Sequence, residues 1–453
     1  MSRATILYEL FNLSISGGTG IATYARNLCS NARELGYDTD GLLHSYRAID
    51  KRDPILAEVS FFDARNREIS PFDRFATRPW RWAMGAPFGI APAALPNGQI
   101  VVQATADRSM ASFGNLYVAN LFMEKARFHF KRFGSAARLK LKKSPDIFHA
   151  TQAIPLAVPG AANIYTIHDI VPLRLPQSTL DDKKYFLELT RYLGKTASKI
   201  ATVSEYSRQD LIKFCGIPEE KVVNTYQSVS FPDEIERMTL EEASRIVQST
   251  FDLAPKDYYL FHGALEPKKN VGRLLDAYVA SGTRRRLVLA GGLGWEYQGD
   301  LEKIENARSN ILRIEDRRIV PDERVRRLQH LPLFQLAALI RCARAVVFPS
   351  LYEGFGLPVL ESMLLGTPVV TSNSTSLKEI AEGAALLVDP TSTGSIMTAI
   401  QRLDADGDLI DRLVGAGHVR ARQFSPARYK ERLAGLYESV LDGASITASS
   451  SSK

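Results

Sequence analysis

Hydrophobic and polar positions follow a regular alternation in the second half of the chain. Runs of four or five mostly apolar residues, typical of strands buried in a parallel sheet, lie at 258–262, 286–290, 345–348, 368–371 and 385–388. Between them, apolar residues recur with helical spacing at 271–280, 334–342 and 376–381. This alternation of strand and helix predicts a parallel sheet with helices on both faces.

The first half shows the same alternation less regularly. Strand candidates lie at 5–10, 41–44, 146–149, 163–168 and 200–203, and helix candidates at 21–35 and 205–214. Ser204 suits the N-cap of the second helix. Between about residues 50 and 120 the pattern assigns no elements. The sequence therefore predicts an α/β fold of two Rossmann-like, doubly wound domains. Such sheets bind ligands beyond the carboxyl ends of their strands, so two facing domains would form one cleft.

The predicted boundary between the domains is the segment around Phe231 and Pro232. Residues 1–231 then form the N-terminal domain and residues 232–425 the C-terminal domain. A terminal helix at 426–442 can cross back to the first domain. The tail at 443–453 is rich in serine, and we expect it to be disordered.

Composition and cysteine usage narrow the class of protein. The 453 residues are 45% hydrophobic and 24% charged, as in soluble globular proteins. The three cysteines are far apart and in no metal-binding spacing, which favours a reducing cytoplasm over a disulfide framework. Glu9 interrupts the first apolar run, so we expect no signal peptide, and no apolar segment is long enough to span a membrane. We therefore expect a cytoplasmic protein.

Positive charge is concentrated between Leu121 and Lys143. This segment has eight Lys or Arg, one acid, Glu124, and several interleaved phenylalanines. One interpretation is a solvated helix with a single core face. The other is a surface that docks on anionic lipid, which would make the protein a peripheral membrane protein at the inner face of the cytoplasmic membrane. No motif indicates binding to nucleic acid.

The segment 350–370, SLYEGFGLPVLESMLLGTPVV, has two glutamates eight positions apart. Pro358 suits the first turn of a helix and Gly366 the residue just past its end. Glu353 then lies in the loop after a strand, and Glu361 lies about one turn into the helix. The free N–H groups near Gly356 would bind phosphate, and the carboxylates would accept hydrogen bonds from hydroxyl groups. This combination suits a sugar nucleotide; the alternative is a turn with two solvated glutamates.

Three further motifs fall at strand ends. The run Gly17-Gly18-Thr19-Gly20 opens a helix and can approach a phosphate with bare amides. His168 ends a strand beside Asp169, where it is either structural or in contact with a ligand hydroxyl. Lys268 and Lys269 follow another strand and can neutralise a diphosphate, although this motif taken alone is better explained as a charged turn.

Other chemistry is disfavoured by the same residues. Thr23 stands where a dinucleotide-binding fingerprint has its third small residue, and no acid closes the second strand, which argues against a nicotinamide enzyme. The run Asp38-Thr39-Asp40 precedes a predicted strand, and Asp404-Ala405-Asp406-Gly407-Asp408 lacks the final glutamate of a calcium loop. We interpret both as turns and predict no metal site.

Six segments together resemble glycosyltransferase family 4, whose members have the two-domain GT-B fold. In chain order they are GGTGIATYARNL, IHDIVPLRLP, VSEYSRQDLI, HGALEPKKNVGRLLDAY, VFPSLYEGFGLPVLESMLLGTPVV and AALLVDP, and they run from Gly17 to Pro390. The resemblance implies a retaining transferase whose N-terminal domain binds the acceptor and whose C-terminal domain binds the nucleotide-sugar donor.

The resemblance also implies roles for individual residues. Three are implied to take part in catalysis: His168 near the transferred sugar, Lys269 on the diphosphate and Glu353 on the sugar hydroxyls. The residues implied to bind the donor are Gly18, Gly20, Lys268, Lys269, His330, Leu331, Glu353, Phe355, Gly356, Leu357 and Glu361. Among these, Glu361 would accept the ribose hydroxyls, and the loop containing His330 and Leu331 would contact the base.

Two positions depart from the family pattern. Lys268 stands where arginine is usual, which keeps the charge but loses the bidentate fork. Gln329-His330 stands where a glycine and an aromatic residue are common, and this affects selectivity for the base.

The expected function is hexosyl transfer in the assembly of a surface polysaccharide such as lipopolysaccharide. Similar bacterial sequences are often mannosyltransferases, so the expected donor is GDP-mannose and the acceptor a growing glycan or lipid-linked saccharide. No cofactor or metal is expected. The alternatives are a transferase of the same fold that uses UDP-glucose or another hexose donor, and a sugar-nucleotide-binding protein without catalysis. A phosphorylase-like enzyme would need a pyridoxal lysine and a longer chain.

Overall fold

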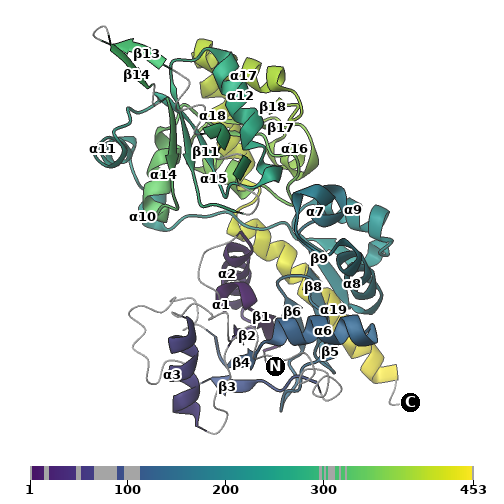
Figure 1. Ribbon diagram of the computed structural model, residues 1–453. Helices are drawn as coiled ribbons and strands as arrows, with labels where there is room; N and C mark the ends of the chain where they lie inside the picture. Colours follow the sequence, from purple (N-terminus) through teal and green to yellow (C-terminus); the bar gives the residue numbers. More distant parts are fainter. Residues whose placement is uncertain are drawn as a thin grey trace.

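The computed structural model describes residues 3–14, 20–46, 53–65, 89–95, 113–294, 298–299, 302–304, 312–315, 318–321 and 324–450. The chain forms two α/β domains stacked one above the other, each built on its own sheet (Figure 1). The predicted fold class, two Rossmann-like domains, is confirmed.

The first sheet has eight strands in the order β10-β9-β8-β6-β1-β2-β4-β3. All neighbours run parallel except β3 and β4. The strands are β1 Thr5–Glu9, β2 Asp38–Ser45, β3 Ala93–Leu95, β4 Leu116–Asn120, β6 Ile147–Ala150, β8 Ala162–Thr166, β9 Lys199–Thr202 and β10 Val222–Asn224. A separate short pair joins β5 Ala137–Arg138 to β7 Leu156–Ala157. The helices are α1 Phe11–Ser14, α2 Gly20–Glu34, α3 Pro54–Arg65, α6 Phe122–Phe133, α7 Val171–Arg174, α8 Lys183–Thr196 and α9 Glu205–Cys215.

The second sheet has six parallel strands in the order β15-β12-β11-β16-β17-β18. The strands are β11 Tyr258–His262, β12 Arg286–Ala290, β15 Val325–Leu328, β16 Ala345–Phe348, β17 Val369–Ser372 and β18 Leu386–Val388. A hairpin joins β13 Leu312–Glu315 to β14 Arg318–Pro321. The helices are α10 Asp233–Glu236, α11 Leu240–Phe251, α12 Val271–Ser281, α14 Leu333–Cys342, α15 Leu357–Leu364, α16 Thr375–Ala381, α17 Thr393–Ala405 and α18 Gly407–Arg422.

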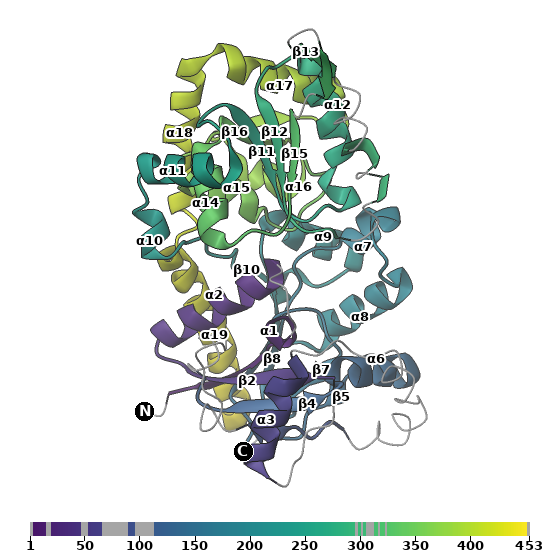
Figure 2. The same ribbon diagram turned by 60° about the vertical axis from the view of Figure 1, so that its left-hand side comes forward.

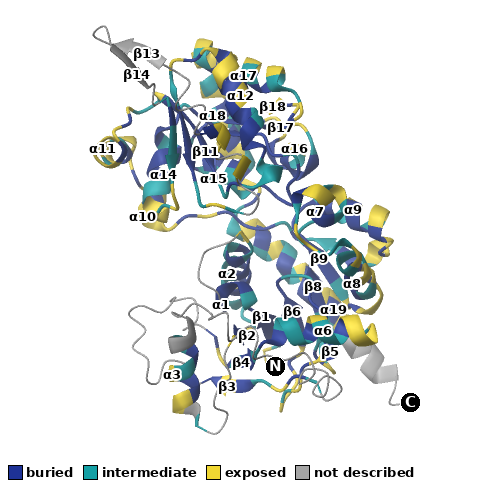
Figure 3. Cartoon of the chain, in the orientation of Figure 1, coloured by how far each residue is buried: buried dark blue, intermediate teal, exposed yellow. Residues whose placement is uncertain are grey.

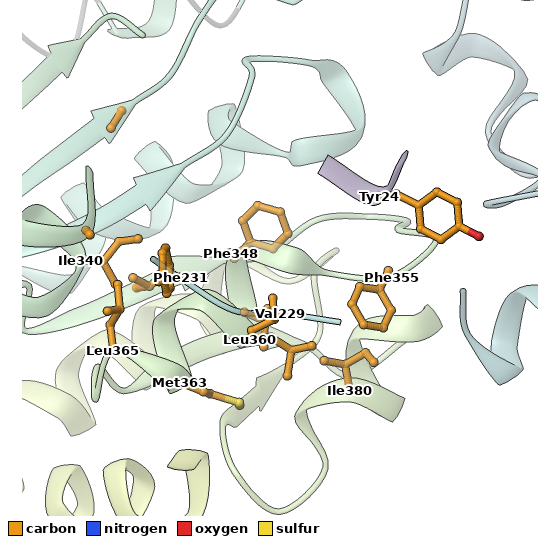
Figure 4. Packing of buried hydrophobic residues seen from close by; sticks show 14 of the residues in the cluster. Tyr24, Val229, Phe231, Ile340, Phe348, Phe355, Leu360, Met363, Leu365 and Ile380 are labelled. Atoms are coloured by element: carbon orange, nitrogen blue, oxygen red, sulfur yellow. The ribbon is translucent and has the colours of Figure 1, made fainter. Parts of the chain in front are cut away.

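The core of the second domain lies between its sheet and the helices on both faces. The central strands of both sheets are buried, the edge strands are partly exposed, and the outer helix faces are exposed (Figure 3). Phe348 at the end of β16 stacks on Phe261 of β11 with ring centroids 5.7 Å apart. Phe355, Leu360 and Ile380 belong to the same hydrophobic cluster (Figure 4). This packing fixes the end of β16 and the start of α15, where the predicted site lies.

The two domains are joined by two crossings of the chain. Residues 225–232, which include the predicted boundary, lead from β10 to α10. The return crossing lies beside the first, because the Val229 N–H donates to the Phe424 carbonyl at 3.0 Å. Asn27 of α2 also donates to the Ser228 carbonyl at 3.1 Å.

The C-terminal helix, α19 Pro426–Ser450, crosses back to the first domain (Figures 1 and 2). The hydroxyl group of Tyr437 is 2.9 Å from that of Tyr8 on β1 and 2.9 Å from Nδ1 of His149 on β6. Lys430 forms an ion pair with Glu34 of α2 at 2.7 Å. The predicted end at residue 442 was wrong. Residues 443–450, expected to be disordered, continue the helix, because this run of small residues contains no proline to stop it.

Both aspartate-rich runs that we interpreted as turns lie largely in regular structure. Asp38 and Asp40 begin β2, where Asp40 accepts hydrogen bonds from the backbone and side chain of Asn115. Asp404 lies in α17 and pairs with Arg285 at 2.6 Å, and Asp406 caps α18. The turn assignment failed because these acids serve as partners and caps, which local composition does not distinguish from turn residues. Within the described residues, no cluster of three His, Cys, Asp or Glu side chains fits a metal ion.

Candidate active site

The loop between β16 and α15 carries Glu353. Its backbone is held from two sides, since the Leu351 N–H donates to the Lys268 carbonyl at 2.8 Å and Ser376 Oγ donates to the carbonyls of Glu353 and Phe355 at 2.8 and 2.7 Å. Gly356 has φ 128°, and a Cβ there would lie 2.8 Å from Leu377. Glycine is therefore required at this turn. The loop, the helix start with its proline and the glycine after its end all follow the sequence prediction.

A buried ion pair joins Lys269 to Glu353. The Lys269 Nζ lies 2.6 Å from Glu353 Oε1 and 4.8 Å from the centre of the Phe348 ring. Lys269 is the last residue of the short 3₁₀ helix η5 Pro267–Lys269, which follows β11. Strand β11 is the neighbour of β16 in the sheet. Burial alone would raise the pKa of Glu353, but the charges of Lys269 and Lys268 outweigh it and hold that pKa below its usual value. Glu353 is therefore ionised near neutral pH, and a diphosphate that reaches Lys269 must compete with this carboxylate.

Lys268 adds a second cation to this site. Its Nζ lies 3.8 Å from Glu266 Oε2. Burial acts to lower the pKa of Lys268, but the carboxylates of Glu353, Asp169 and Glu266 raise it above its ordinary value. Lys268 therefore stays charged, and Asp169 is close enough to act on it although it belongs to the other domain.

Glu361 lies in the second turn of α15, beside His262 at the end of β11. The Glu361 carboxylate is 3.8 Å from His262 Nδ1, and its side chain is 23% exposed. Burial lowers the pKa of His262 to about 4, so the ring is neutral and supplies no charge to Glu361. Burial also raises the pKa of Glu361 to about 7. A carboxylate in this state titrates within the physiological range.

His168 follows β8 at the carboxyl edge of the first sheet. Its Nε2 lies 2.9 Å from the Thr151 carbonyl. A carbonyl only accepts, so Nε2 carries the proton. Burial lowers the pKa of His168, so the ring is neutral and Nδ1 is left as an acceptor. The ring also meets Tyr24 of α2 edge to face, with centroids 4.9 Å apart.

Gly354 brings the two halves of the site together. A Cβ on Gly354 would lie 2.5 Å from the His168 carbonyl oxygen and 3.0 Å from Asp169 Cβ, so the loop after β16 touches the loop after β8. The sequence predicted that each loop lies at a sheet edge. The structure places the two loops in contact, with His168 beside the loop that carries Glu353.

The remaining predicted residues have the following positions. Gly18 lies outside the described residues, and Gly20 is the first residue of α2. The Phe355 side chain is buried in the core, which leaves only its backbone for a ligand. Gly356 is the N-cap of α15, and Leu357 is its first residue. His330 is exposed and Leu331 half-buried, just after β15, which is separated from β11 by β12.

Sequence reasoning missed the residues that join the two loops. Ser207 was quoted only as part of a motif, and Tyr352 and Glu379 were assigned no role. A serine at the start of a helix, such as Ser207, is typical of a helix cap, and an acid in a short helix, such as Glu379, is typical of a surface residue. Neither pattern carries a signal for a contact with the other domain.

Two facing sheets, one parallel and the other parallel except at its β3 edge, with a basic site at their carboxyl edges, define the GT-B class of fold. The model of glycosyl transferases group 1 matches residues 247–418, and that of glycosyltransferase family 4 matches residues 99–229. The chain belongs to the family-4 glycosyltransferases.

Two curated relatives are named for mannosyl transfer. O-antigen chain mannosyltransferase B of Escherichia coli is 34% identical over 267 residues, which are 58% of this chain and 66% of the relative. O-antigen chain mannosyltransferase RfbU of Salmonella typhimurium is 27% identical over 248 residues, 54% of this chain and 62% of the relative. The match thus spans slightly less than two thirds of each relative.

Solved structures share the fold at low identity. Sucrose-phosphate synthase from Thermosynechococcus elongatus has a TM-score of 0.65 at 16% identity, covering 97% of this chain and 100% of that one. Anabaena Alr3699/HepE in complex with UDP and glucose has a TM-score of 0.62 at 15% identity, covering 96% and 100%. These likenesses support the GT-B architecture.

Proposed function

We propose that the protein is a retaining glycosyltransferase that moves mannose from GDP-mannose to a growing glycan or lipid-linked saccharide in surface-polysaccharide biosynthesis. The observation that carries this proposal is the buried Lys269–Glu353 pair beside the N-terminus of α15 and the His168 loop. It combines a cation for a diphosphate with a carboxylate for sugar hydroxyls. The names of the two mannosyltransferase relatives support the choice of sugar.

In this mechanism separate residues bind the ribose, the diphosphate and the sugar of the donor. Glu361 accepts hydrogen bonds from the ribose, the lysines and the first amides of α15 hold the diphosphate, and Glu353 with neutral His168 holds the sugar. The bond between the anomeric carbon and the diphosphate oxygen breaks, and its electron pair leaves with the diphosphate. The acceptor hydroxyl forms the new bond on the same face and gives its proton to the departing phosphate oxygen. Lys269 stabilises the charge that develops there, and we propose no metal.

A different hexose donor is the second candidate. The loop Gln329-His330, after β15, departs from the family pattern at the position implied to contact the base. One structural neighbour was solved with UDP and glucose. UDP-glucose therefore remains a specific alternative to GDP-mannose, and a sugar-nucleotide-binding protein without turnover is the alternative of another class.

Donor hydrolysis across a panel of sugar nucleotides tests the proposal. We expect GDP-mannose to give the highest kcat/KM and EDTA to leave it unchanged. A higher kcat/KM for UDP-glucose would make UDP-glucose the donor in place of GDP-mannose. If the protein bound sugar nucleotides but hydrolysed none of them, the non-catalytic alternative would be favoured. A complete loss in EDTA that magnesium restores would contradict catalysis by the lysines.

Nucleotide affinity is expected to rise with pH through about 7. In the free protein, burial raises the pKa of Glu361 to about 7, so a large fraction is protonated at pH 6. Ribose hydroxyls donate better to the ionised form, so binding favours the carboxylate and strengthens as it forms. Calorimetry of GDP at pH 6 and pH 8 measures this change.

The Glu361→Gln variant is the control, because the phosphates of GDP titrate in the same range. We expect the variant to bind GDP more weakly at pH 8 and to keep only the pH dependence that belongs to GDP. If the GDP affinity of the variant and of the parent depended on pH in the same way, Glu361 would not be part of the nucleotide site.

We also propose peripheral contact with the inner face of the cytoplasmic membrane through α6 and the segment after it. Helix α6 buries Phe122, Ala126 and Phe130, as a solvated helix with one core face would. Its other side presents exposed cations, and Phe133 is 47% exposed. An exposed phenylalanine ring with the guanidinium of Arg132 over it, 5.5 Å from the ring centre, suits an anionic lipid surface. No helix among the described residues is long and apolar enough to cross a membrane.

Binding to anionic vesicles is expected to exceed binding to neutral ones and to weaken as salt rises. Four serine substitutions at the exposed residues Arg132, Lys140, Lys142 and Lys143 should reduce it several-fold and leave GDP affinity unchanged. Lys131 is excluded because it pairs with Asp182 at 2.7 Å. Vesicle co-sedimentation measures the effect.

The control removes the same charge from the second domain, at the exposed residues Arg245, Arg284, Arg402 and Arg422. If both quadruple variants lost vesicle binding equally, net charge alone would explain it. If neither did, α6 would be an ordinary solvated helix.

A further inference from the structure

A carboxylate of the second domain caps a helix of the first. Glu379 on α16 reaches the N-terminus of α9, where Oε1 accepts the Glu205 N–H at 2.9 Å and Oε2 accepts the Tyr206 N–H at 2.9 Å. These N–H groups have no partner within their own helix. A negative charge at that end also interacts favourably with the helix dipole. The contact therefore fastens the two domains to each other through two charge-assisted hydrogen bonds.

Two further contacts lie within the same interface. The Tyr352 hydroxyl, in the loop before Glu353, donates to Asp210 Oδ2 of α9 at 2.5 Å. Ser207 Oγ of α9 lies 2.8 Å from the His168 carbonyl and 3.2 Å from the Gly354 carbonyl. One hydroxyl group thus spans the two loops that form the predicted sugar site.

Helix α16 connects Glu379 rigidly to the loop that carries Glu353. At its start, Ser376 Oγ is hydrogen-bonded to the carbonyls of Glu353 and Phe355. At its end, Arg420 of α18 donates to the carbonyls of Glu379 and Ile380. Figures 1 and 2 show α16 on the side of the second domain that faces α9, and the two helices are in contact at the junction of the domains. A shift of α9 against α16 would therefore move His168 relative to Glu353.

We infer that Glu379 is a positioning residue, which holds α9 on α16 and thereby fixes His168 opposite Glu353 for transfer of the sugar. This inference rests on the proposed function, because it assigns the gap between the two loops to the donor sugar. It also separates two properties of the site. The residues that the proposed mechanism assigns to free GDP, which include Lys269 and Glu361, lie in the second domain. We therefore expect the binding of GDP to depend little on this contact.

The test is the Glu379→Gln variant of the full chain. Glutamine has the same size, but its single oxygen accepts only one of the two N–H groups, and its NH₂ group faces the other. We expect kcat to fall at least tenfold and the calorimetric Kd for GDP to stay within twofold. Glu382→Gln, an exposed glutamate three residues further on, is the matched control and should behave as the parent.

Hydrogen exchange supplies a readout that does not require turnover. In Glu379→Gln the amides of Glu205 and Tyr206 should exchange faster, and so should those of Gly354 and Phe355. A role limited to capping α9 would change the first pair only. Tyr352→Phe, which removes the hydrogen bond to Asp210, should also lower kcat. In the double variant Glu379→Gln/Tyr352→Phe, the fold-decrease in kcat should be smaller than the product of the two single decreases.

The outcomes separate this inference from the proposed function. If kcat in Glu379→Gln equals that of the parent, or if exchange at Gly354 and Phe355 is unchanged, the positioning role is overturned. If GDP affinity falls as much as kcat, Glu379 supports the second domain as a whole instead. If the parent turns over no donor, the proposed function fails, while the exchange at these four amides still decides whether the contact holds the loop.

Discussion

The Lys269→Met variant is expected to lose roughly a hundredfold to a thousandfold in kcat/KM, the range seen when one preorganised charge-stabilising group is removed. In the proposed mechanism Lys269 stabilises the departing diphosphate, and its position is fixed by the packing of Phe348 and by the ion pair with Glu353. Methionine keeps the length of the apolar stem and removes the charge. Steady-state kinetics with GDP-mannose and calorimetry with GDP measure the effect.

The control for this variant is Lys303→Met, at an exposed lysine that pairs with Asp276 at 3.1 Å in the same domain. It should keep the activity of the parent. Lys269→Met leaves Glu353 buried without its partner, which destabilises the fold to some extent. Thermal unfolding of Lys269→Met/Glu353→Gln, which removes both charges, separates that loss of stability from loss of catalysis. Full activity in Lys269→Met would contradict the mechanism.

Glu353→Gln is expected to lower kcat about tenfold to a hundredfold without weakening the binding of free GDP. Each lost hydrogen bond to a charged group costs roughly 1.5–3 kcal/mol, and contacts to the sugar tighten as positive charge develops on the anomeric carbon. Glu353 competes for Lys269 in the free protein, so its neutralisation should leave Lys269 more available to the diphosphate. GDP affinity should stay equal or rise slightly.

Comparison with Glu361→Ala makes this prediction specific. That variant should weaken binding of GDP and of the intact donor alike, because it removes the proposed acceptor for the ribose. If Glu353→Gln abolished GDP binding while Glu361→Ala spared it, the two roles would be reversed. If neither change affected binding or turnover, both glutamates would be structural.

The sequence predicted best those elements that local chemistry specifies. Strands β11, β12 and β16 have the predicted bounds, because a strand covered on both faces is a continuous apolar run that turn residues interrupt. Helix α15 was predicted from its proline and from the glycine past its end, and Ser204 caps α9 as expected. Such signals lie within a few residues of the element that they define.

The contacts that make the site were beyond a single sequence. Lys269 and Glu353 are 84 positions apart, and they meet only because β11 and β16 are neighbours in the sheet. On local grounds a charged turn explained the two lysines better than a ligand site did, and solvated glutamates explained Glu353 and Glu361 equally well. Glu379 and its partner Glu205 are 174 positions apart and lie in different domains. Their pairing depends on how the domains face each other, which strand and helix patterns leave open.

The return of α19 to the first domain has a consequence for how the chain is made. Residues 233–424 are an insertion between two parts of one packing unit, because Tyr437 completes the hydrogen bonding of Tyr8 and His149. During synthesis, the second domain can therefore fold while the first still lacks its last helix. Domains usually fold in the order in which they emerge. Here the N-terminal domain reaches its final packing only after residues 426–450 have left the ribosome, so a stop codon near residue 425 would damage the beginning of the protein rather than its end.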